Sequence, residues 1–380
     1  MGKSALNFVN AIFVFGLLIV SCSGKKMPEE KKMAEPEVQQ VLEDESAEDT
    51  IWQEEARYEF YESPDFDFSF NDTIDGALYS LRVNSKTDGN EYMGISAYTK
   101  DGKVHAQKHI GVNSVFTFRL YDASDNLIAE NSMDRYDLEA YVAVDLLAGS
   151  RGDYWNFKGY FDEFGSYFLY TYWMFEDSDL GEDYIVFLNR DLKVKDFFYN
   201  SFTGGDGCHC DIESSQDGKT FAFCSRIYRS NGKHNENFKK DLQVTGSFVL
   251  NNDYCLVVYN FEGKPPYTNA HIIDNRGVAV KKFDYTGISG ALGYIIPRFK
   301  VDDQEALFLL DHEKRSLYRI DLNNPLKIDL IKIDDLEKMQ EGEVLNENDP
   351  AYIQISAEAK DFTFEYKDGK FRYYSESKDY

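Results

Sequence analysis

The chain has 380 residues, 43% of them hydrophobic and 16% aromatic, which is enough to build one large domain or two ordinary ones. Its formal net charge is −26, which disfavours nucleic acid and anionic lipid surfaces as partners, because binding either requires a basic surface. The acidity fits a protein kept soluble outside the cytosol; recruitment of cations or of a basic partner is the alternative.

The first 21 residues predict a cleaved signal peptide. Lys3 precedes an apolar run that leads into Ile19-Val20-Ser21-Cys22. This pattern resembles that of bacterial lipoproteins, which implies that Cys22 is acylated and becomes the mature N-terminus. The run from Ala5 to Val20 covers about 16 residues, against roughly 20 needed to span a bilayer. An uncleaved transmembrane anchor and a buried helix are therefore the weaker interpretations.

The residue after the cysteine bears on placement. In the lipoprotein family an Asp at that position accompanies retention in the inner membrane, whereas here Ser23 follows Cys22. The resemblance therefore implies the outer membrane of the cell envelope, with the periplasmic or surface-exposed side left open. Lipoproteins of this type carry two or three acyl chains, which implies stable anchoring.

Residues 22–63 predict an acidic, flexible tether. Acidic residues dominate this segment and apolar residues are sparse up to Ile51. Such a composition buries too little apolar surface to offset the entropy of ordering the chain. The tether would hold the folded body away from the lipid.

From about Phe66 onward, apolar and polar residues alternate with a period of two, which predicts β-strands. Turn sequences such as Lys100-Asp101-Gly102-Lys103 and Gln216-Asp217-Gly218-Lys219 supply the positive φ angles that tight hairpins need. The chain is therefore predicted to be all-β. Expected strands include Glu91–Thr99, Val115–Tyr121, Tyr154–Phe161, Tyr167–Phe175, Tyr184–Leu188, Val194–Tyr199, Thr220–Ser225, Cys255–Tyr259, Ala306–Leu310 and Ser316–Ile320.

The longer period indicates the architecture. Strand groups recur about every 45 residues, which matches four-stranded propeller blades of about 40–50 residues. Residues 151–380 are predicted to form blades of a β-propeller with about 6–7 blades in all. Residues 64–150 are predicted to supply the first blades or a small β-sandwich. Two β-sandwich-like domains are the alternative for the whole body.

One hairpin supports this prediction. Ser215-Gln216-Asp217-Gly218-Lys219 with the apolar run to Phe223 resembles the TolB-type propeller repeat, whose common form is Ser-Pro-Asp-Gly-Lys followed by an apolar strand. The chain departs from that form at Gln216. As a whole it resembles the six-bladed, TolB-like β-propeller lipoproteins of Bacteroidetes-type bacteria, over roughly residues 157–372.

The remaining cysteines form the sharpest chemical cluster. Cys208-His209-Cys210 lies one hairpin away from Cys224. In a strand, His209 points away from the two thiols, so a zinc or copper site is the weakest interpretation. A disulfide, with Cys210–Cys224 as the pair, and buried unpaired thiols both stay open. No metal or cofactor is predicted.

Aromatic residues suggest a binding platform. Trp155, Tyr170, Tyr172 and Trp173 could stack on sugars or peptides if exposed, and packing between blades is the alternative and favoured reading. No catalytic motif is recognised, so the first functional hypothesis is a lipid-anchored binding or scaffold module for protein, peptide or glycan. The alternatives are a propeller-type polysaccharide hydrolase or lyase, and a structural subunit of a cell-surface complex.

Overall fold

The computed structural model of the 380-residue chain supports a description of most residues from Thr50 onward. Residues 1–49, which hold the predicted signal peptide, Cys22 and most of the predicted tether, lie outside it, as do Cys208 and Cys210. The described residues are 50–60, 65–74, 76–152, 154–175, 178, 181–203, 213–239, 242–260, 268–290, 293–301, 306–311, 313–333, 343–344, 352–356, 360–367 and 370–377.

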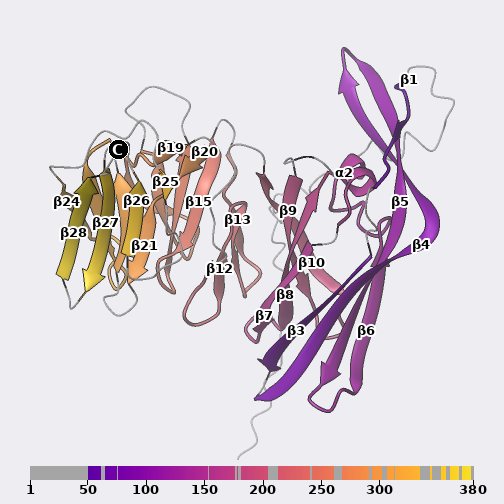
Figure 1. Cartoon of the computed structure of the whole chain (residues 1–380), viewed down its shortest axis with the longest axis horizontal. Helices are drawn as coiled ribbons and strands as arrows, with labels where there is room; N and C mark the ends of the chain where they lie inside the picture. The colour runs from indigo at the N-terminus through magenta and orange to yellow at the C-terminus, as the bar shows by residue number, and fades with distance from the viewer. Residues whose placement is uncertain are drawn as a thin grey trace, which may run out of the picture. The chain divides into compact units, whose positions relative to one another are not determined.

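The first sheet is built on one long antiparallel hairpin (Figure 1). Its turn has positive φ at Asp101 (52°) and Gly102 (75°), as a two-residue hairpin turn of this twist requires. The sheet has six strands and is dominated by two of 24 and 20 residues, whose pairing register shifts between Thr87 and Glu91. Its strands are β1 (Thr50–Trp52), β2 (Ala56–Arg57), β3 (Phe66–Ile74), β4 (Ala77–Lys100), β5 (Lys103–Asp122) and β6 (Leu127–Asp134).

The predicted tether ends earlier than expected. β1 and β2 both pair with β5, and Ala56 stands opposite His109 in parallel register. The backbone N–H of Tyr58 donates to the carbonyl of Ile110 over 2.9 Å. Residues 51–58 are thus part of the folded body, because the free edge of β5 offers backbone hydrogen bonds that the local composition does not reveal.

A short buried helix, α2 (Val144–Gly149), follows the first sheet. Its last turn is held by Arg135, whose fully buried guanidinium donates to the carbonyl oxygens of Leu147 and Arg151. Burial lowers the pKa of Arg135 to about 10. The period-two pattern predicted no such helix, since six residues give too little periodicity to detect.

Beyond α2, the described residues form consecutive four-stranded antiparallel sheets, each a simple meander (Figure 1). The first two contain β7 (Tyr154–Phe161), β8 (Ser166–Met174), β9 (Gly181–Leu188) and β10 (Val194–Thr203), then β11 (Glu213–Ser214), β12 (Thr220–Ala222), β13 (Arg226–Arg229) and β14 (His234–Glu236). The third contains β15 (Gln243–Val249), β16 (Tyr254–Asn260), β17 (Ala270–Asp274) and β18 (Ala279–Phe283).

Two further four-stranded sheets follow a two-stranded one. The pair is β19 (Ile288–Gly290) and β20 (Gly293–Ile295). The next sheet contains β21 (Arg298–Val301), β22 (Ala306–Asp311), β23 (Ser316–Asp321) and β24 (Ile328–Lys332). The last contains β25 (Glu343–Val344), β26 (Tyr352–Ser356), β27 (Lys360–Lys367) and β28 (Lys370–Ser377).

Neighbouring sheets share hydrophobic cores. The first sheet and the β7–β10 sheet enclose one cluster together with α2, and Phe187 and Phe221 join the β7–β10 sheet to the β11–β14 sheet. Val257 and Ile227 belong to the next cluster, and further contacts connect the β15–β18 sheet to the β21–β24 sheet. Consecutive meanders that pack face to face are the organisation of propeller blades, so the all-β, propeller-type prediction is confirmed.

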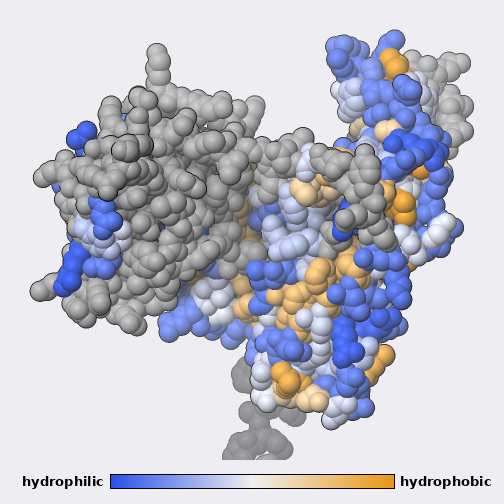
Figure 2. All heavy atoms as spheres, in the orientation of Figure 1, coloured by the Kyte–Doolittle hydropathy of each residue, from blue (hydrophilic) through white to orange (hydrophobic). Residues whose placement is uncertain are grey.

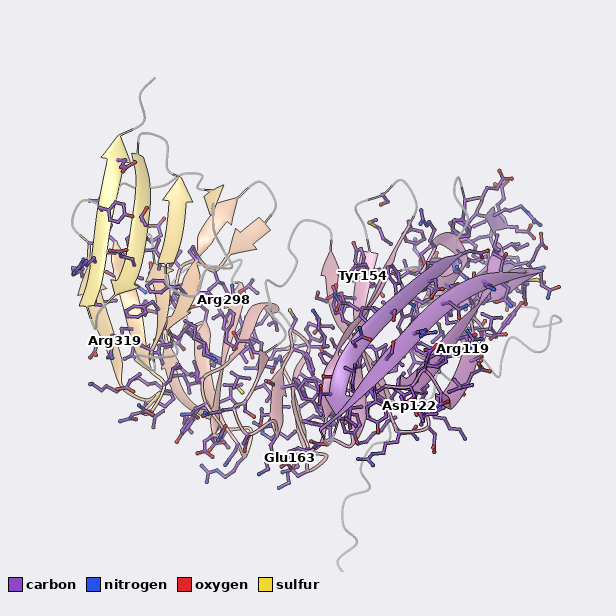
Figure 3. All side chains as sticks on the ribbon, turned by 60° about the horizontal axis from the view of Figure 1, so that its bottom comes forward. Arg119, Asp122, Tyr154, Glu163, Arg298 and Arg319 are labelled. Carbon is purple, nitrogen blue, oxygen red and sulfur yellow. The ribbon has the colours of Figure 1, made fainter. Side chains whose placement is uncertain are left out.

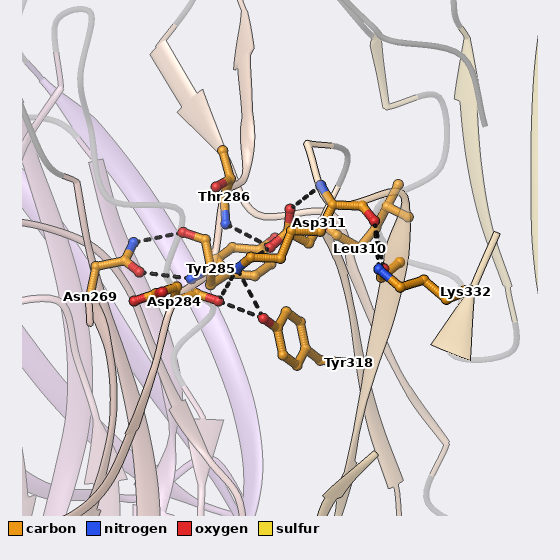
Figure 4. Close-up of polar contacts among 10 residues, drawn as sticks. Asn269, Asp284, Tyr285, Thr286, Leu310, Asp311, Tyr318 and Lys332 are labelled. Atoms are coloured by element: carbon orange, nitrogen blue, oxygen red, sulfur yellow. Dashed lines mark hydrogen bonds and ion pairs between the residues drawn. The ribbon is translucent and has the colours of Figure 1, made fainter. Parts of the chain in front are cut away.

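Polar contacts reinforce one of these junctions (Figure 4). The hydroxyl of Tyr285, just after β18, donates to the carbonyl of Leu310 on β22 over 3.0 Å. Asn269 holds the backbone of Tyr285 with two hydrogen bonds of 2.8 Å, and Tyr318 donates to the carbonyl of Asp284 over 2.6 Å. The β15–β18 and β21–β24 sheets are therefore tied by hydrogen bonds as well as by apolar packing.

Candidate functional site

Two of the four residues expected to form an aromatic platform lie in the core. Trp155 is 2% exposed and Trp173 is fully buried. Trp155 packs against the rings of Phe116 and Phe118, with centroids 5.7 and 5.2 Å apart. The prediction that Trp155 and Trp173 form part of an exposed binding platform is therefore wrong. The alternation of β7 and β8 turns them toward the first sheet, where no ligand can reach their faces.

Tyr170 and Tyr172 are partly exposed, so their proposed contact with a ligand stays a prediction. Tyr170 lies beside Asp183 of β9, and burial together with this carboxylate raises the pKa of the Tyr170 hydroxyl. Asp183 itself is 4% exposed, and burial raises its pKa.

A bulge in β10 directs two side chains to Asp183. The register of β10 against β9 shifts between Tyr199 and Ser201, and both Asn200 and Ser201 then donate to Oδ2 of Asp183, over 3.0 and 2.6 Å. In a regular strand these successive side chains would point to opposite faces. Asn200 also accepts a long hydrogen bond of 3.4 Å from the backbone of Ser225, which links this network to the next sheet.

The cysteines divide into two kinds. Cys224 is disulfide-bonded, and Cys210, its predicted partner, lies outside the described residues, so the pairing stays a prediction. Cys255 of β16 is a free, buried thiol, and burial raises its pKa to about 12. Because the thiolate is the nucleophilic form, a buried thiol with a raised pKa is a poor nucleophile at neutral pH.

Another polar cluster lies between the first sheet and the segment that follows β2. Nε2 of His109 is 2.8 Å from the hydroxyl of Ser96, and its Nδ1 is 3.2 Å from the hydroxyl of Tyr58. His109 is 4% exposed and burial lowers its pKa. These contacts fasten the N-terminal segment to β5 rather than form an open site.

The best candidate site is a cavity of about 620 Å³. Three successive four-stranded sheets contribute to it through β11, the β15–β16 turn, β21 and the β23–β24 loop. This volume lies within the roughly 300–1,000 Å³ typical of ligand pockets. Its lining residues are Ser214, Gln216, Val249, Leu250, Asn251, Asn252, Asp253, Lys300, Leu322 and Asn323.

The cavity wall formed by the β15–β16 turn is rigidly held. Asn251 donates to the carbonyl of Leu322 over 2.6 Å, and its Oδ1 accepts from the backbone N–H groups of Asp253 and Tyr254. These bonds fix the turn against the β23–β24 loop. The wall is therefore preorganised for a ligand, since little conformational freedom is left to lose on binding.

The surface that the cavity offers to a ligand is polar. Its apolar members are almost fully buried, at 3% for Val249, 2% for Leu250 and 8% for Leu322. The amides of Gln216 and Asn323 are exposed. Such groups both donate and accept, so the cavity suits a ligand rich in hydroxyl or amide groups.

The sequence alone does not predict this cavity. It predicts a turn around Gln216, and in the structure this turn forms one wall of the cavity. The polar run Asn251-Asn252-Asp253 between two apolar strands marks this place in the sequence, but by itself such a run predicts only a turn.

In the described part of the chain, no cluster of three or more His, Cys, Asp and Glu side chains is arranged to hold a metal ion. None of the described helices is both long and apolar enough to cross a bilayer.

No protein-family model matches the chain, and no curated protein matches it. Among solved structures it is similar to the dihydro-heme d1 dehydrogenase NirN in complex with DHE, at 15% identity over 56% of this chain and 43% of that chain, with a TM-score of 0.36. It is also similar to apo AztD from Citrobacter koseri, at 11% identity over 80% of this chain and 84% of that chain, with a TM-score of 0.33.

A third similar structure is an auxiliary nutrient binding protein from Bacteroides thetaiotaomicron VPI-5482, at 8% identity, covering 55% of this chain and 66% of that chain, with a TM-score of 0.30. The chain spans less than half the length of NirN and just under two thirds of the nutrient binding protein. At these identities and TM-scores, the likenesses carry no conclusion about a ligand or an activity.

Proposed function

We propose that the chain is a lipid-anchored, extracytoplasmic β-propeller that binds a protein, peptide or glycan ligand in the cavity between Gln216, Asn251 and Asn323. The observation that carries the proposal is the cavity itself. Three successive sheets contribute to it, and the groups it exposes are hydrogen-bonding ones. Loops that project from a rigid scaffold are the usual carriers of binding function.

The lining favours binding over polysaccharide hydrolysis. Hydrolysis of a glycosidic bond generally uses two carboxylates about 5–10 Å apart. The described residues that line the cavity supply one carboxylate, Asp253, together with amides, a hydroxyl and Lys300. None of the residues of the predicted aromatic platform lines this cavity, and the amide-rich lining takes its place as the source of affinity in this proposal.

The membrane anchor of the proposal rests on the leader sequence. The apolar run that ends at Ser21-Cys22 supports acylation of Cys22, and the absence of Asp at position 23 supports the outer membrane. Intact-mass measurement of the mature chain tests this directly. A mature N-terminus other than Cys22, or an unacylated Cys22, would contradict the anchor while leaving the cavity unaffected.

A blocking substitution tests the binding site. In Asn323→Trp, a large side chain enters the cavity, while the backbone N–H of residue 323 can still donate to Asp321. The matched control is Leu127→Trp. Leu127 is 51% exposed and lies on β6 of the first sheet, which contributes no described residue to the cavity lining. The full chain in detergent is screened against peptide and glycan arrays. We expect Asn323→Trp to lose the signals that the parent and Leu127→Trp share. Equal signals from all three proteins would contradict the proposal.

A further inference from the structure

We infer that the ligand of this cavity is a glycan that carries a carboxylate, held by the ammonium group of Lys300. The inference rests on the proposed function, because it assumes that the cavity binds a ligand, and it specifies the chemistry of that ligand. Its starting point is a cation in the wall of a polar cavity in a chain of net charge −26.

The register of β21 directs Lys300 toward the β15–β18 sheet. Lys300 and Arg298 are two residues apart on β21, so their side chains share a face. Arg298 is labelled in Figure 3. Its guanidinium lies over the ring of Phe248 on β15, 4.5 Å from the ring centroid. Lys300 therefore faces the same sheet, next to the β15–β16 turn that forms the cavity wall.

The side chain of Lys300 makes no hydrogen bond or ion pair with the described residues, although it is only partly exposed. Two lysines in the loops that connect the strands of this sheet have carboxylate neighbours, since Lys314 lies 3.1 Å from Asp311 and Lys327 lies 4.0 Å from Asp321. An ammonium group with unused donors at the wall of a cavity is complementary to an anionic group on a ligand. Bonds between two charged groups are the stronger class of hydrogen bond.

The other groups restrict the ligand further. Asp253 has an exposed carboxylate that accepts from the Asn275 amide over 3.1 Å, so it repels a second anionic group and accepts from hydroxyls. Gln216, Asn323 and Ser214 add neutral donors and acceptors. One carboxylate surrounded by hydroxyls is the pattern of a uronic acid.

A peptide fits these walls less well. The apolar side chains of a peptide need apolar surface, and the apolar lining residues Val249, Leu250 and Leu322 are between 2% and 8% exposed. The hydroxyls of a sugar need the exposed amides and the carboxylate that the cavity does present. The cavity therefore favours an acidic sugar over a peptide whose terminal carboxylate would meet Lys300.

Two trisaccharides that differ only at C6 of the terminal residue, one ending in galacturonic acid and one ending in galactose, test the inference by isothermal titration calorimetry on the full chain. We expect the trisaccharide with the single carboxylate to bind at least about tenfold tighter, the effect of one charge-assisted hydrogen bond. Lys300→Gln should remove this preference, and Lys300→Arg should keep most of it. The control Lys327→Gln removes the same charge from an exposed position outside the cavity lining and should leave the preference intact.

The outcomes separate this inference from the proposed function. Equal affinity for the two sugars, or a preference that survives Lys300→Gln, overturns the inference. So does a peptide with a free C-terminus that binds tighter than both sugars and tighter than its amidated form. Any of these results leaves the proposed function standing if binding is lost in Asn323→Trp. Binding that no cavity substitution changes contradicts both.

Discussion

Replacing Trp155 by alanine separates a core residue from a ligand platform. Trp155 is 2% exposed, lies against Phe116 and Phe118, and donates from Nε1 to the carbonyl of Gly152 over 3.2 Å. If this packing is its role, Trp155→Ala destabilises the fold. If Trp155 served a ligand instead, the substitution would remove binding and leave the stability unchanged.

The size of the effect follows from the burial. An aromatic side chain of this size removes about 150–250 Å² from water, which at about 25 cal/mol per Å² amounts to roughly 4–6 kcal/mol. Substitutions of buried Phe or Trp by alanine typically cost about 3–5 kcal/mol, because the surroundings relax only in part. We expect a loss of about 4 kcal/mol. At about 2–4 °C per kcal/mol, the Tm falls by about 8–16 °C.

Thermal unfolding followed by circular dichroism measures this loss. The control is Tyr154→Ala at the residue labelled in Figure 3. Tyr154 precedes Trp155 on β7, so strand alternation directs it to the other face, and it is 45% exposed. We expect its Tm to fall by much less than that of Trp155→Ala. Equal Tm values for parent and Trp155→Ala would refute the assignment of Trp155 to the core.

Further predictions concern a turn, a buried acid, the disulfide and the anchor. Gly218→Val should cost about 1–3 kcal/mol, because φ of +67° is unfavourable for a β-branched residue; an unchanged urea midpoint would count against this. Burial raises the pKa of Asp183, so its contribution to stability is greatest below the ordinary Asp pKa of about 3.9 and falls as the pH rises to the folded-state pKa. Between acid and neutral pH, the Tm of Asp183→Asn should therefore fall by less than the Tm of the parent. Identical profiles of Tm against pH would disprove this role of Asp183. Reducing the disulfide of Cys224 should cost about 2–4 kcal/mol, so a Tm insensitive to dithiothreitol would contradict a stabilising bridge. Cys22→Ser should abolish membrane partition, and unchanged detergent extraction would rule out lipidation as the anchor.

The sequence by itself determined the elements whose cause is local. Alternation with a period of two follows from the geometry of a strand, and the positive φ at Gly102 and Gly218 follows from the turn residues placed there. The strand groups about every 45 residues pointed to blade-sized sheets. These features need no knowledge of what the chain packs against, which is why the all-β, propeller-type prediction could be made from the residues alone.

Only the tertiary structure decided which faces are buried and which distant residues meet. The residues around Trp155 in the sequence do not indicate whether its ring is buried or exposed. The pairing of Ala56 with His109 depends on the free edge of β5. The cavity brings together Ser214, Asn251 and Lys300, which lie in three different sheets. Their proximity results from the register of each sheet and from the packing between sheets, and neither leaves a signal in a short stretch of sequence.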